Sequence, residues 1–532
     1  MPDQFTERLN LFAKKSAETQ GQSNQSLLTL LQRGIERECL RINPEGRLAQ
    51  TPHPKELGSA LTHPYITTDF SEALLELITP VSNSIEETID CLDKVHRAIY
   101  PHLGNEELWS ASMPCVVADE ESIPVAQYGK SNVAQMKTTY RKGLGHRYGR
   151  LMQTIAGIHY NFSLPDAMWQ VLQTQDYDKR PLQDYKTDSY FKQIRNFRRS
   201  SWLLIYLYGA SPAVCESFIK GRDHELERFD KGSFHLPKGT SLRMGGLGYQ
   251  SNAQENLNIC YNSLDNYIDT LQCAITNNHP DYEKIGLQNN GEFQQLSTAL
   301  LQIENEFYSP IRPKRVTASG EIPLAALKND GVEYIEVRCI DVNPYLPLGI
   351  DEDQIRFLDC FLIYCLFKRS PLCDDSDRQR INANQRNVVN QGRDPDLVLS
   401  TPSGDRKLQD WGNEILDDVD KIAQLLDSAH GGDNYQRVCS EQRKKIVDPE
   451  LTPSAKILAD MQQQETPFFG FAIDLSRKHG DNFRNRPLDE SQQDSFKKHQ
   501  EQSEQKQKSI EESDTEGFAE FLTNYHQQYE NL

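Results

Sequence analysis

The sequence predicts an α+β fold in which helices pack on a sheet with one polar face. Residues 333–341 alternate strictly, with apolar side chains on one side and charged ones on the other, as expected of a strand with one buried face. Residues 157–163 alternate in the same way, and residues 34–42 place Glu36 and Glu38 on one strand face. Between such segments, apolar residues recur at helical spacing, for example after the capping box at 84–87.

The polar sides of these three segments carry metal-ligand atoms. Glu36 and Glu38 share a face of the first segment, His159 and Asn161 share a face of the second, and Glu336 lies on the third. If the segments form one sheet, its carboxylates would repel one another unless a cation lies among them. Oxygen ligands with a single histidine suit Mg²⁺ or Mn²⁺ better than zinc.

Each of these residues alone has a plainer interpretation. A single glutamate on a strand is usually solvated, His159 by itself fits a hydrogen-bonded core histidine, and Arg338 beside Glu336 fits a structural ion pair. The joint pattern favours a site, because the opposite faces of the segments are apolar and buried carboxylates are costly unless they are paired or bind metal.

Composition limits the classes of partner. The 532-residue chain has a net charge of −19 and a pI of about 5.2, which argues against nucleic acid or an anionic membrane as the main partner. Its 11 cysteines are an odd number without a CxxC pair, which favours reduced thiols. We find neither a signal peptide nor an apolar run of the roughly 18–20 residues needed to span a bilayer. We therefore expect a cytoplasmic protein.

The predicted elements follow in order along the chain. Residues 1–33 are predicted to be helical, followed by a strand at 35–42. Residues 185–222 are predicted to form a helical pair broken at 209–212, and residues 255–285 are predicted to be helical.

Residues 66–78 are open to two interpretations. Asp69, Glu72 and Glu76 share one face if the segment is a helix. On a strand, Glu72 and Glu76 would still share a face but Asp69 would not.

In the second half of the chain, a strand within residues 301–315 precedes the strand at 333–341, and the residues that follow are predicted to be mainly helical. Residues 301–315 are interpreted as a strand that leads into a basic loop at 312–315. Residues 355–367 are apolar nearly all round, which predicts a buried helix. Residues 490–515 are polar and fit a solvated helix or disorder. Residues 518–529 carry one aromatic helical stripe that should pack on the body of the protein.

Five strings of sequence occur in order between about residues 30 and 370. They are Gly34-Ile-Glu-Arg-Glu38, Thr67-Thr-Asp-Phe-Ser-Glu72, Gly157-Ile-His-Tyr-Asn-Phe162, Gln302-Ile-Glu-Asn-Glu-Phe-Tyr308 and Tyr334-Ile-Glu-Val-Arg338. Together they resemble the bacterial glutamate–cysteine ligases. One string would be weak evidence, whereas five in order across most of the chain are specific.

The resemblance implies a fold and an activity. The fold would be that of the glutamine synthetase-like carboxylate–amine ligases, a curved, open, mainly antiparallel sheet whose concave face holds metals and substrates. The activity would be ATP-dependent ligation of the γ-carboxylate of L-glutamate to the amine of L-cysteine through a γ-glutamyl phosphate, the first step of glutathione biosynthesis. Residues 1–375 would form the catalytic region and residues 376–532 a helical region packed on the same body, with one single domain as the alternative. We expect no second, glycine-adding enzyme in the chain.

The resemblance also implies roles for individual residues. The positions that hold or surround Mg²⁺, or alternatively Mn²⁺, would be Glu36, Glu38, Asp69, Glu76, His159 and Glu336. Arg338 would contact the phosphate that is transferred from the co-substrate ATP. The amino-acid pocket would include Phe70, Tyr140, Arg141, Gln153, Arg243, Tyr249 and Tyr308. The expected partners are ATP, L-glutamate and L-cysteine, with no nucleic acid or membrane, and the expected state is a monomer.

Two rival functions remain at this point. One is a sister ligase that joins glutamate to another amine; Tyr140, Arg141 and Tyr249 favour cysteine as the acceptor. The other is a binding protein without activity; the intact set of acidic residues and Arg338 favours an enzyme.

Overall fold

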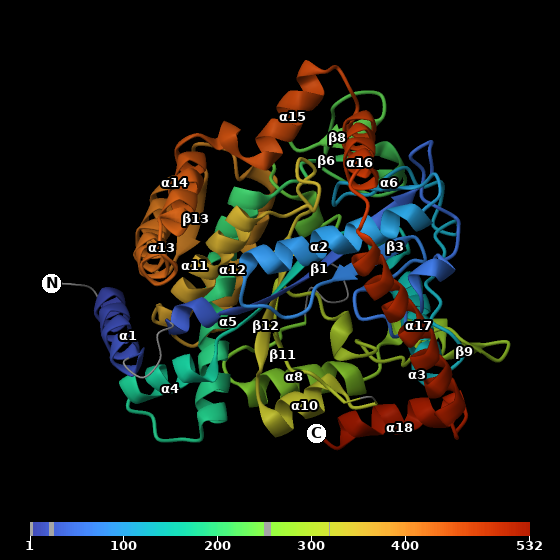
Figure 1. Cartoon of the computed structure of the whole chain (residues 1–532), viewed down its shortest axis with the longest axis horizontal. Coiled ribbons are helices and arrows are strands. Elements are labelled where there is room, and N and C mark those ends of the chain that lie inside the picture. The colour runs from blue at the N-terminus through green and yellow to red at the C-terminus, as the bar shows by residue number, and fades with distance from the viewer. Residues whose placement is uncertain (1–3, 21–25, 249–256, 319) are drawn as a thin grey trace.

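A seven-stranded antiparallel sheet lies at the centre of the computed structural model, which describes residues 4–20, 26–248, 257–318 and 320–532 (Figure 1). Six strands are paired in the order β11-β12-β5-β1-β3-β2, and β4 pairs with the end of β1. The strands are β1 (Gln32–Ile42), β2 (Ile66–Thr68), β3 (Leu74–Ile78), β4 (Glu107–Leu108), β5 (Ile158–Ser163), β11 (Ile311–Lys314) and β12 (Tyr334–Ile340). The predicted α+β fold with an open antiparallel sheet is thus confirmed.

The register of the sheet brings its polar residues together. Glu36 of β1 lies opposite His159 of β5, and Glu38 lies opposite Glu76 of β3. On β12, Glu336 lies opposite Asn161. Because side chains alternate between the two faces of a strand, these pairs share one face. The other face is apolar and buried, and it includes Ile35, Tyr160, Phe162, Ile335 and Val337.

Helices cover the apolar face of the sheet and continue into the C-terminal part. Helices α5 and α11 pack on each other, and α5 also contacts β11 and β12. The helices are α1 (Gln4–Gln20), α2 (Ile85–Ile99), α3 (Asn132–Tyr148), α4 (Asp166–Gln175), α5 (Leu182–Tyr208), α6 (Glu216–Ile219), α8 (Leu264–Thr276), α9 (Pro280–Ile285), α10 (Pro323–Asp330), α11 (Glu352–Phe367), α12 (Asp375–Gln391), α13 (Leu408–His430), α14 (Asn434–Val447), α15 (Pro453–Gln463), α16 (Phe468–Arg484), α17 (Glu490–Ser513) and α18 (Phe518–Glu530).

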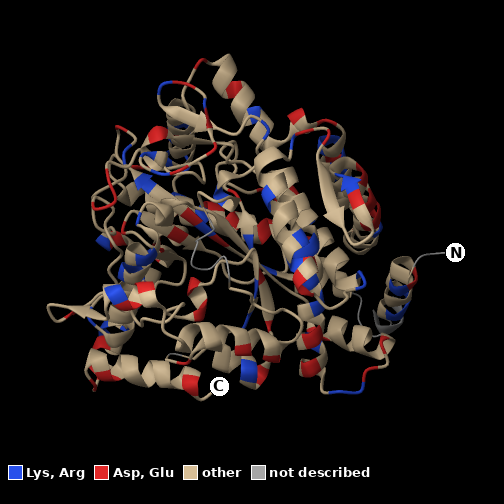
Figure 2. Cartoon of the chain, turned by 180° about the vertical axis from the view of Figure 1, so that it is seen from behind, with Lys and Arg blue, Asp and Glu red and all other residues tan. Residues whose placement is uncertain are grey.

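One small three-stranded sheet and two strand pairs lie outside the central sheet. They are β6 (Ala213–Cys215), β7 (Glu227–Arg228) and β8 (Ser233–His235), β9 (Gln288–Asn289) with β10 (Glu292–Phe293), and β13 (Val398–Thr401) with β14 (Gly404–Lys407). Acidic and basic residues both occur over the helices and around the sheet (Figure 2). Among the described residues, no helix is both long enough and apolar enough to cross a membrane.

A buried ion pair joins the apolar face of the sheet to α11. The Arg33 side chain on β1 lies 2.6 Å from the carboxylate of Asp359, and both side chains are fully buried. The hydroxyl of Tyr160 on β5 donates to the same carboxylate at 2.7 Å. One carboxylate therefore joins two neighbouring strands to the helix beneath them.

Several predicted elements are confirmed. The helix at 355–367 is α11, nearly all of which is buried. The polar segment at 490–515 is the solvated helix α17, in which only Ser503 is buried. The aromatic stripe at 518–529 belongs to α18, whose Leu522, Tyr525 and Tyr529 are buried.

Other predicted elements are wrong. The helical interpretation of residues 66–78 fails, because the segment is the hairpin of β2 and β3 with Asp69 just after β2. The second helix predicted within 185–222 is reduced to the four-residue α6 after β6. The helical segment predicted for 1–33 ends too late, because Gln32 already belongs to β1.

The strand predicted within 301–315 lies later than expected. The supposed basic loop is the edge strand β11, in which Arg312 pairs with Glu336 of β12. Proline at position 313 is compatible with this strand, because an edge strand leaves one row of backbone groups unpaired.

A buried histidine makes stability depend on pH. His63 is 7% exposed, and its Nδ1 accepts hydrogen bonds from the backbone N–H groups of Tyr65 at 3.2 Å and Ile66 at 3.0 Å. Burial, with the neighbouring His499 and His53, lowers its pKa to about 4. The unfolded chain, with an ordinary histidine pKa of about 6.5, therefore binds this proton more readily, and the stability due to neutral His63 falls as the pH falls from about 6.5 toward 4.

We predict that His63→Asn removes this pH dependence while its amide oxygen keeps the role of acceptor. Between pH 7.5 and pH 5, the free energy of unfolding of the wild type should fall relative to that of the variant by about 2 kcal/mol. Urea unfolding followed by circular dichroism at both pH values measures this difference. An equal pH dependence in both proteins would show that His63 titrates normally.

Candidate active site

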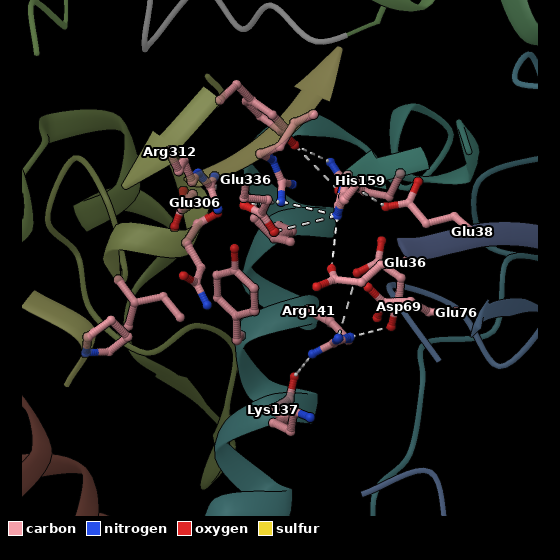
Figure 3. A pocket seen from close by; sticks show the side chains of 18 of the residues that line it. Glu36, Glu38, Asp69, Glu76, Lys137, Arg141, His159, Glu306, Arg312 and Glu336 are labelled. Carbon is pink, nitrogen blue, oxygen red and sulfur yellow. Dashed lines mark hydrogen bonds and ion pairs between the residues drawn. The ribbon is translucent and has the colours of Figure 1, made fainter. Parts of the chain in front are cut away.

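A cavity of about 330 Å³ opens on the polar face of the sheet (Figure 3). Its walls come from β1, β3, β5, β11 and β12, from α3, and from the short helical turn η6 (Glu304–Glu306). Most of the residues predicted from the sequence line it: Glu36, Glu38, Asp69, Glu76, Tyr140, Arg141, Gln153, His159, Tyr308, Glu336 and Arg338. Strands far apart in the sequence thus contribute to one site.

Three side chains form a group suited to a divalent cation. One ligand atom from each of Glu36, His159 and Glu336 lies within 4.8 Å of the others. His159 Nδ1 is 3.1 Å from Glu36 Oε2 and 3.7 Å from Glu336 Oε1. Its Nε2 is buried without a hydrogen-bond partner among the described residues and lies 3.5 Å from Glu38 Oε1. Two carboxylates and an imidazole nitrogen fit the donor set that Mg²⁺ or Mn²⁺ accepts.

The charge on Glu336 is favoured by the groups around it. Burial opposes ionisation of this carboxylate, which is 1% exposed, but nearby cations outweigh that effect and hold its pKa well below the usual range. Lys314 Nζ is 3.7 Å from Glu336 Oε1, and Arg338 Nη1 is 3.1 Å from Oε2. Glu336 is therefore held in its charged form.

The neighbouring carboxylates behave in the opposite way. Burial raises the pKa of Glu76 well above its usual value, and the charges of Glu36, Asp69 and Glu38 add to this. Burial also raises the pKa of Glu38, although its Oε2 accepts a hydrogen bond from the Gly157 N–H at 2.6 Å. These carboxyls therefore hold their protons to a higher pH than usual unless positive charge compensates them, which is the property expected at a cation site.

Helix α3 supplies a basic and aromatic wall. Lys137, Tyr140 and Arg141 all line the cavity, because residues three and four apart share one helical face. Arg141 donates to the backbone carbonyl of Asp69 and lies 3.7 Å from its carboxylate. Burial and the charge of Arg141 lower the pKa of Lys137 to about 8.

Sequence reasoning missed several residues of the cavity. They are Lys137, Asn305, Glu306, Arg312, Lys314 and Tyr525. For Arg312 and Lys314 a signal existed, because they alternate with Ile311 and Pro313 at the period of a strand. The helical spacing of Lys137 and Arg141 was also visible in the sequence.

Two residues predicted for the amino-acid pocket do not line it in the structure, Phe70 and Arg243. Phe70 is 1% exposed and packs in an apolar cluster beside α3. Arg243 is fully buried and donates to the backbone carbonyl of Arg338 at 2.8 Å. Both residues lie behind the cavity wall. Phe70 packs with Leu144 of α3, and Arg243 is hydrogen-bonded to the backbone of Arg338; Leu144 and Arg338 both line the cavity. Tyr249 lies outside the described residues.

The arrangement suits phosphoryl chemistry. A group of carboxylates that can hold a cation lies beside Arg338 and Lys314, and the two basic side chains offer positive charge to a phosphoryl group. The 11 cysteines are free thiols, and the described cavity-lining residues include neither cysteine nor serine.

Comparisons with known proteins agree with this chemistry. Residues 17–388 match the family described as glutamate-cysteine ligase. A glutamate–cysteine ligase of Saccharophagus degradans is 50% identical over 95% of this chain and 96% of the relative, and one of Alcanivorax borkumensis is 52% identical over 85% and 87%. The crystal structure of a glutamate–cysteine ligase from Francisella tularensis in complex with AMP superposes with a TM-score of 0.89 and 35% identity, covering 94% of this chain and 98% of that one. This chain belongs to the glutamate–cysteine ligase family.

Proposed function

We propose that this enzyme joins the γ-carboxylate of L-glutamate to the amine of L-cysteine at the expense of ATP, the first step of glutathione biosynthesis. The observation that carries the proposal is the acidic cavity with Arg338 and Lys314, in a chain about 50% identical to glutamate–cysteine ligases over nearly its whole length. The relative from Francisella tularensis binds AMP, which supports an adenine nucleotide as co-substrate.

The cation would be held by Glu36, His159 and Glu336, with Glu38 and Glu76 next to them. When bound, Mg²⁺ neutralises the repulsion between the triphosphate and the carboxylate that attacks it. Of the residues named for this role, Glu336 is held in its charged form, and the buried Nε2 of His159 offers a further lone pair or proton.

Arg338 and Lys314 would act on the phosphoryl group. In the first step the glutamate γ-carboxylate oxygen attacks the γ-phosphorus of ATP, the bond to the β-phosphate oxygen breaks, and ADP leaves. In the second step the cysteine amine, as the free base, attacks the carbonyl carbon of the acyl phosphate, the bond to the phosphate oxygen breaks, inorganic phosphate leaves, and the amine nitrogen loses one proton to solvent. Negative charge increases on the phosphoryl oxygens, and the two cations flanking Glu336 stabilise it by charge-assisted hydrogen bonds.

The acceptor would bind between α3 and the segment after η6. Tyr140 and Arg141 lie on α3, and the Gln153 side chain donates to the Tyr308 hydroxyl at 3.1 Å. Phe70 and Arg243 would support this wall from behind. A sister ligase that uses another amine would share the cation site and differ here.

The wider setting of the enzyme is also a proposal. We propose a catalytic region at 1–375 and a helical region at 376–532 that is packed on the same body, as supported by the ion pairs Arg437–Asp353 at 2.7 Å and Arg484–Glu107 at 2.7 Å. All 11 cysteines being free thiols supports a reducing, cytoplasmic location. We propose that the enzyme acts as a monomer on small molecules.

The test of the function is phosphate release from ATP with Mg²⁺ and L-glutamate, with and without L-cysteine, beside a panel of other amines. We expect release that requires both amino acids, with γ-glutamylcysteine as the product. Release with another amine and none with cysteine would identify a sister ligase. No release with any acceptor would remove the enzymatic proposal.

We predict that Glu336→Gln lowers kcat by about a hundredfold or more, because the variant loses the charge that holds the cation. The Mg²⁺ concentration that gives half-maximal activity should also rise. The thermal unfolding temperature of the variant should stay close to that of the wild type. Glu333→Gln is the matched control, because Glu333 is exposed one residue before the same strand. Near-normal kcat of Glu336→Gln at saturating Mg²⁺ would show that the cation is held elsewhere.

We predict that Lys314→Gln lowers kcat/KM for ATP by about tenfold, because the variant loses one of the two positive charges that flank Glu336 and would face the phosphoryl group. The measurement is steady-state kinetics at pH 7.5 with saturating glutamate and cysteine. Lys328→Gln, at an exposed position of α10, is the matched control and should leave kcat/KM unchanged. An unchanged kcat/KM in Lys314→Gln would remove this role for Lys314.

A further inference from the structure

A second cavity, of about 480 Å³, lies outside the candidate active site. Its walls come from the short helical turn η2 (Lys55–Leu57), from the start of β2 and the segment before it, from the end of α2 with the turn η3 (Tyr100–His102), and from the first half of α17. Helix α17 runs from α16 towards α18 (Figure 1). No described residue lines both this cavity and the one on the polar face of the sheet. The proposed reaction therefore leaves the second cavity unused.

The deep part of this second cavity is apolar except for one side chain. Among the described lining residues, the buried ones are Leu57, His63, Ile66, Ala98 and Leu488. All of these except His63 are apolar. Apolar walls with a single polar group at a fixed place are typical of pockets for small molecules, and the volume falls within the range of roughly 300–1,000 Å³ that such pockets have.

His63 offers a hydrogen-bond donor to the cavity. Its Nδ1 accepts from the backbone N–H groups of Tyr65 and Ile66, so the proton of the neutral ring lies on Nε2. The side chain is 7% exposed, and within the described part of the chain no group accepts a hydrogen bond from Nε2. A pKa of about 4 keeps the ring neutral at pH 7. Because a buried donor without an acceptor is costly, an acceptor on a ligand would be favoured at this point.

The charged residues of this cavity lie at its mouth. Glu56, Asp494 and Lys497 are exposed, and they carry both signs of charge. The guanidinium of Arg97 is bound to the backbone carbonyl of Pro487 at 2.8 Å and to Asp93 at 3.4 Å. None of the described lining residues that are buried carries a charge at pH 7. Since burying an ion without a charged partner is costly, the deep part suits a neutral ligand.

We propose that this second cavity binds a neutral, mainly apolar small molecule whose carbonyl oxygen accepts a hydrogen bond from His63 Nε2. The apolar body of the ligand would pack on Leu57, Ile66, Ala98 and Leu488 and displace water from them. The ligand would thus satisfy the one buried donor and cover the apolar walls around it. The inference does not depend on the proposed ligase reaction, because it uses a different cavity and a different class of ligand.

The test uses the full chain and the fluorescent ketone prodan, a neutral dimethylaminonaphthalene that carries one propionyl group. The emission of prodan moves to shorter wavelength in apolar surroundings and to longer wavelength when its carbonyl accepts a hydrogen bond. Titration of prodan with the wild-type protein should give saturable binding. The dissociation constant and the emission maximum of bound prodan are the two readouts, and the second reports the hydrogen bond itself.

His63→Asn removes the Nε2 donor, because the shorter amide ends before that position, while its oxygen still accepts from the backbone. The dissociation constant of prodan should rise by about threefold to tenfold, as expected for the loss of one neutral hydrogen bond. The emission of bound prodan should also move to shorter wavelength. His102→Asn is the matched control, because His102 is exposed at the mouth of the same cavity, and it should change neither readout.

Ala98→Leu tests the cavity without altering the donor. The larger side chain extends from α2 into the space that the ligand needs, so saturable binding of prodan should be lost. If His63→Asn does not fold, this variant decides whether the cavity is the binding site.

Three results would overturn the inference. The first is prodan binding that is unchanged in Ala98→Leu. The second is an emission maximum that is unchanged in His63→Asn, or that moves equally in His102→Asn. The third is binding of the anionic probe anilinonaphthalene sulfonate that is tighter than that of prodan and is lost in Ala98→Leu, because this result would show that the cavity prefers an anion.

Discussion

The rest of the site depends on holding several carboxylates close together in a buried place. Glu36, Glu38, Glu76 and Glu336 share one cavity, and burial disfavours the charge on each of them. The protein resolves the conflict unevenly. Lys314 and Arg338 keep Glu336 charged, and the His159 hydrogen bond leaves the pKa of Glu36 below its usual value despite burial. The pKa of Glu76, in contrast, is raised well above its usual value. A cation among these groups would remove the remaining repulsion, which is the physical reason to expect one there.

The packing beneath the sheet makes this arrangement possible. The antiparallel register sets Glu36 against His159 and Glu38 against Glu76, and a slip of one residue would turn these side chains to the other face. The Asp359 carboxylate, which joins β1 and β5 to α11 through Arg33 and Tyr160, opposes such a slip from the apolar side. The buried ion pair on the apolar face therefore helps to fix the register of β1 and β5, and that register sets the positions of the charged side chains on the opposite face.

The cavity collects residues from nearly the whole chain. The carboxylates and His159 come from β1, β3, β5 and β12 and from the turn after β2, and the basic wall comes from α3; η6, α10 and the last helix add further lining residues. The polar helix α17, which precedes α18, lies mostly in solvent and holds the chain to the body by hydrogen bonds such as that from the Ser59 N–H to the Ser503 hydroxyl at 3.0 Å. Although α17 has few apolar residues, these hydrogen bonds fix its position, and α17 thereby leads the chain to α18, which packs beside the cavity.

The sequence by itself determined the strands that carry Glu36, His159 and Glu336, because alternation with a period of two is a local property that a half-buried strand requires. It also determined the buried helix α11 and, through five motifs in order, the family. Only the tertiary structure decided that residues 66–78 form a hairpin, that Lys314 forms an ion pair with Glu336, and that Tyr525 lines the cavity. These features depend on which distant strand supplies the partner and where a helix docks, and such long-range contacts leave no periodicity in the segment that makes them.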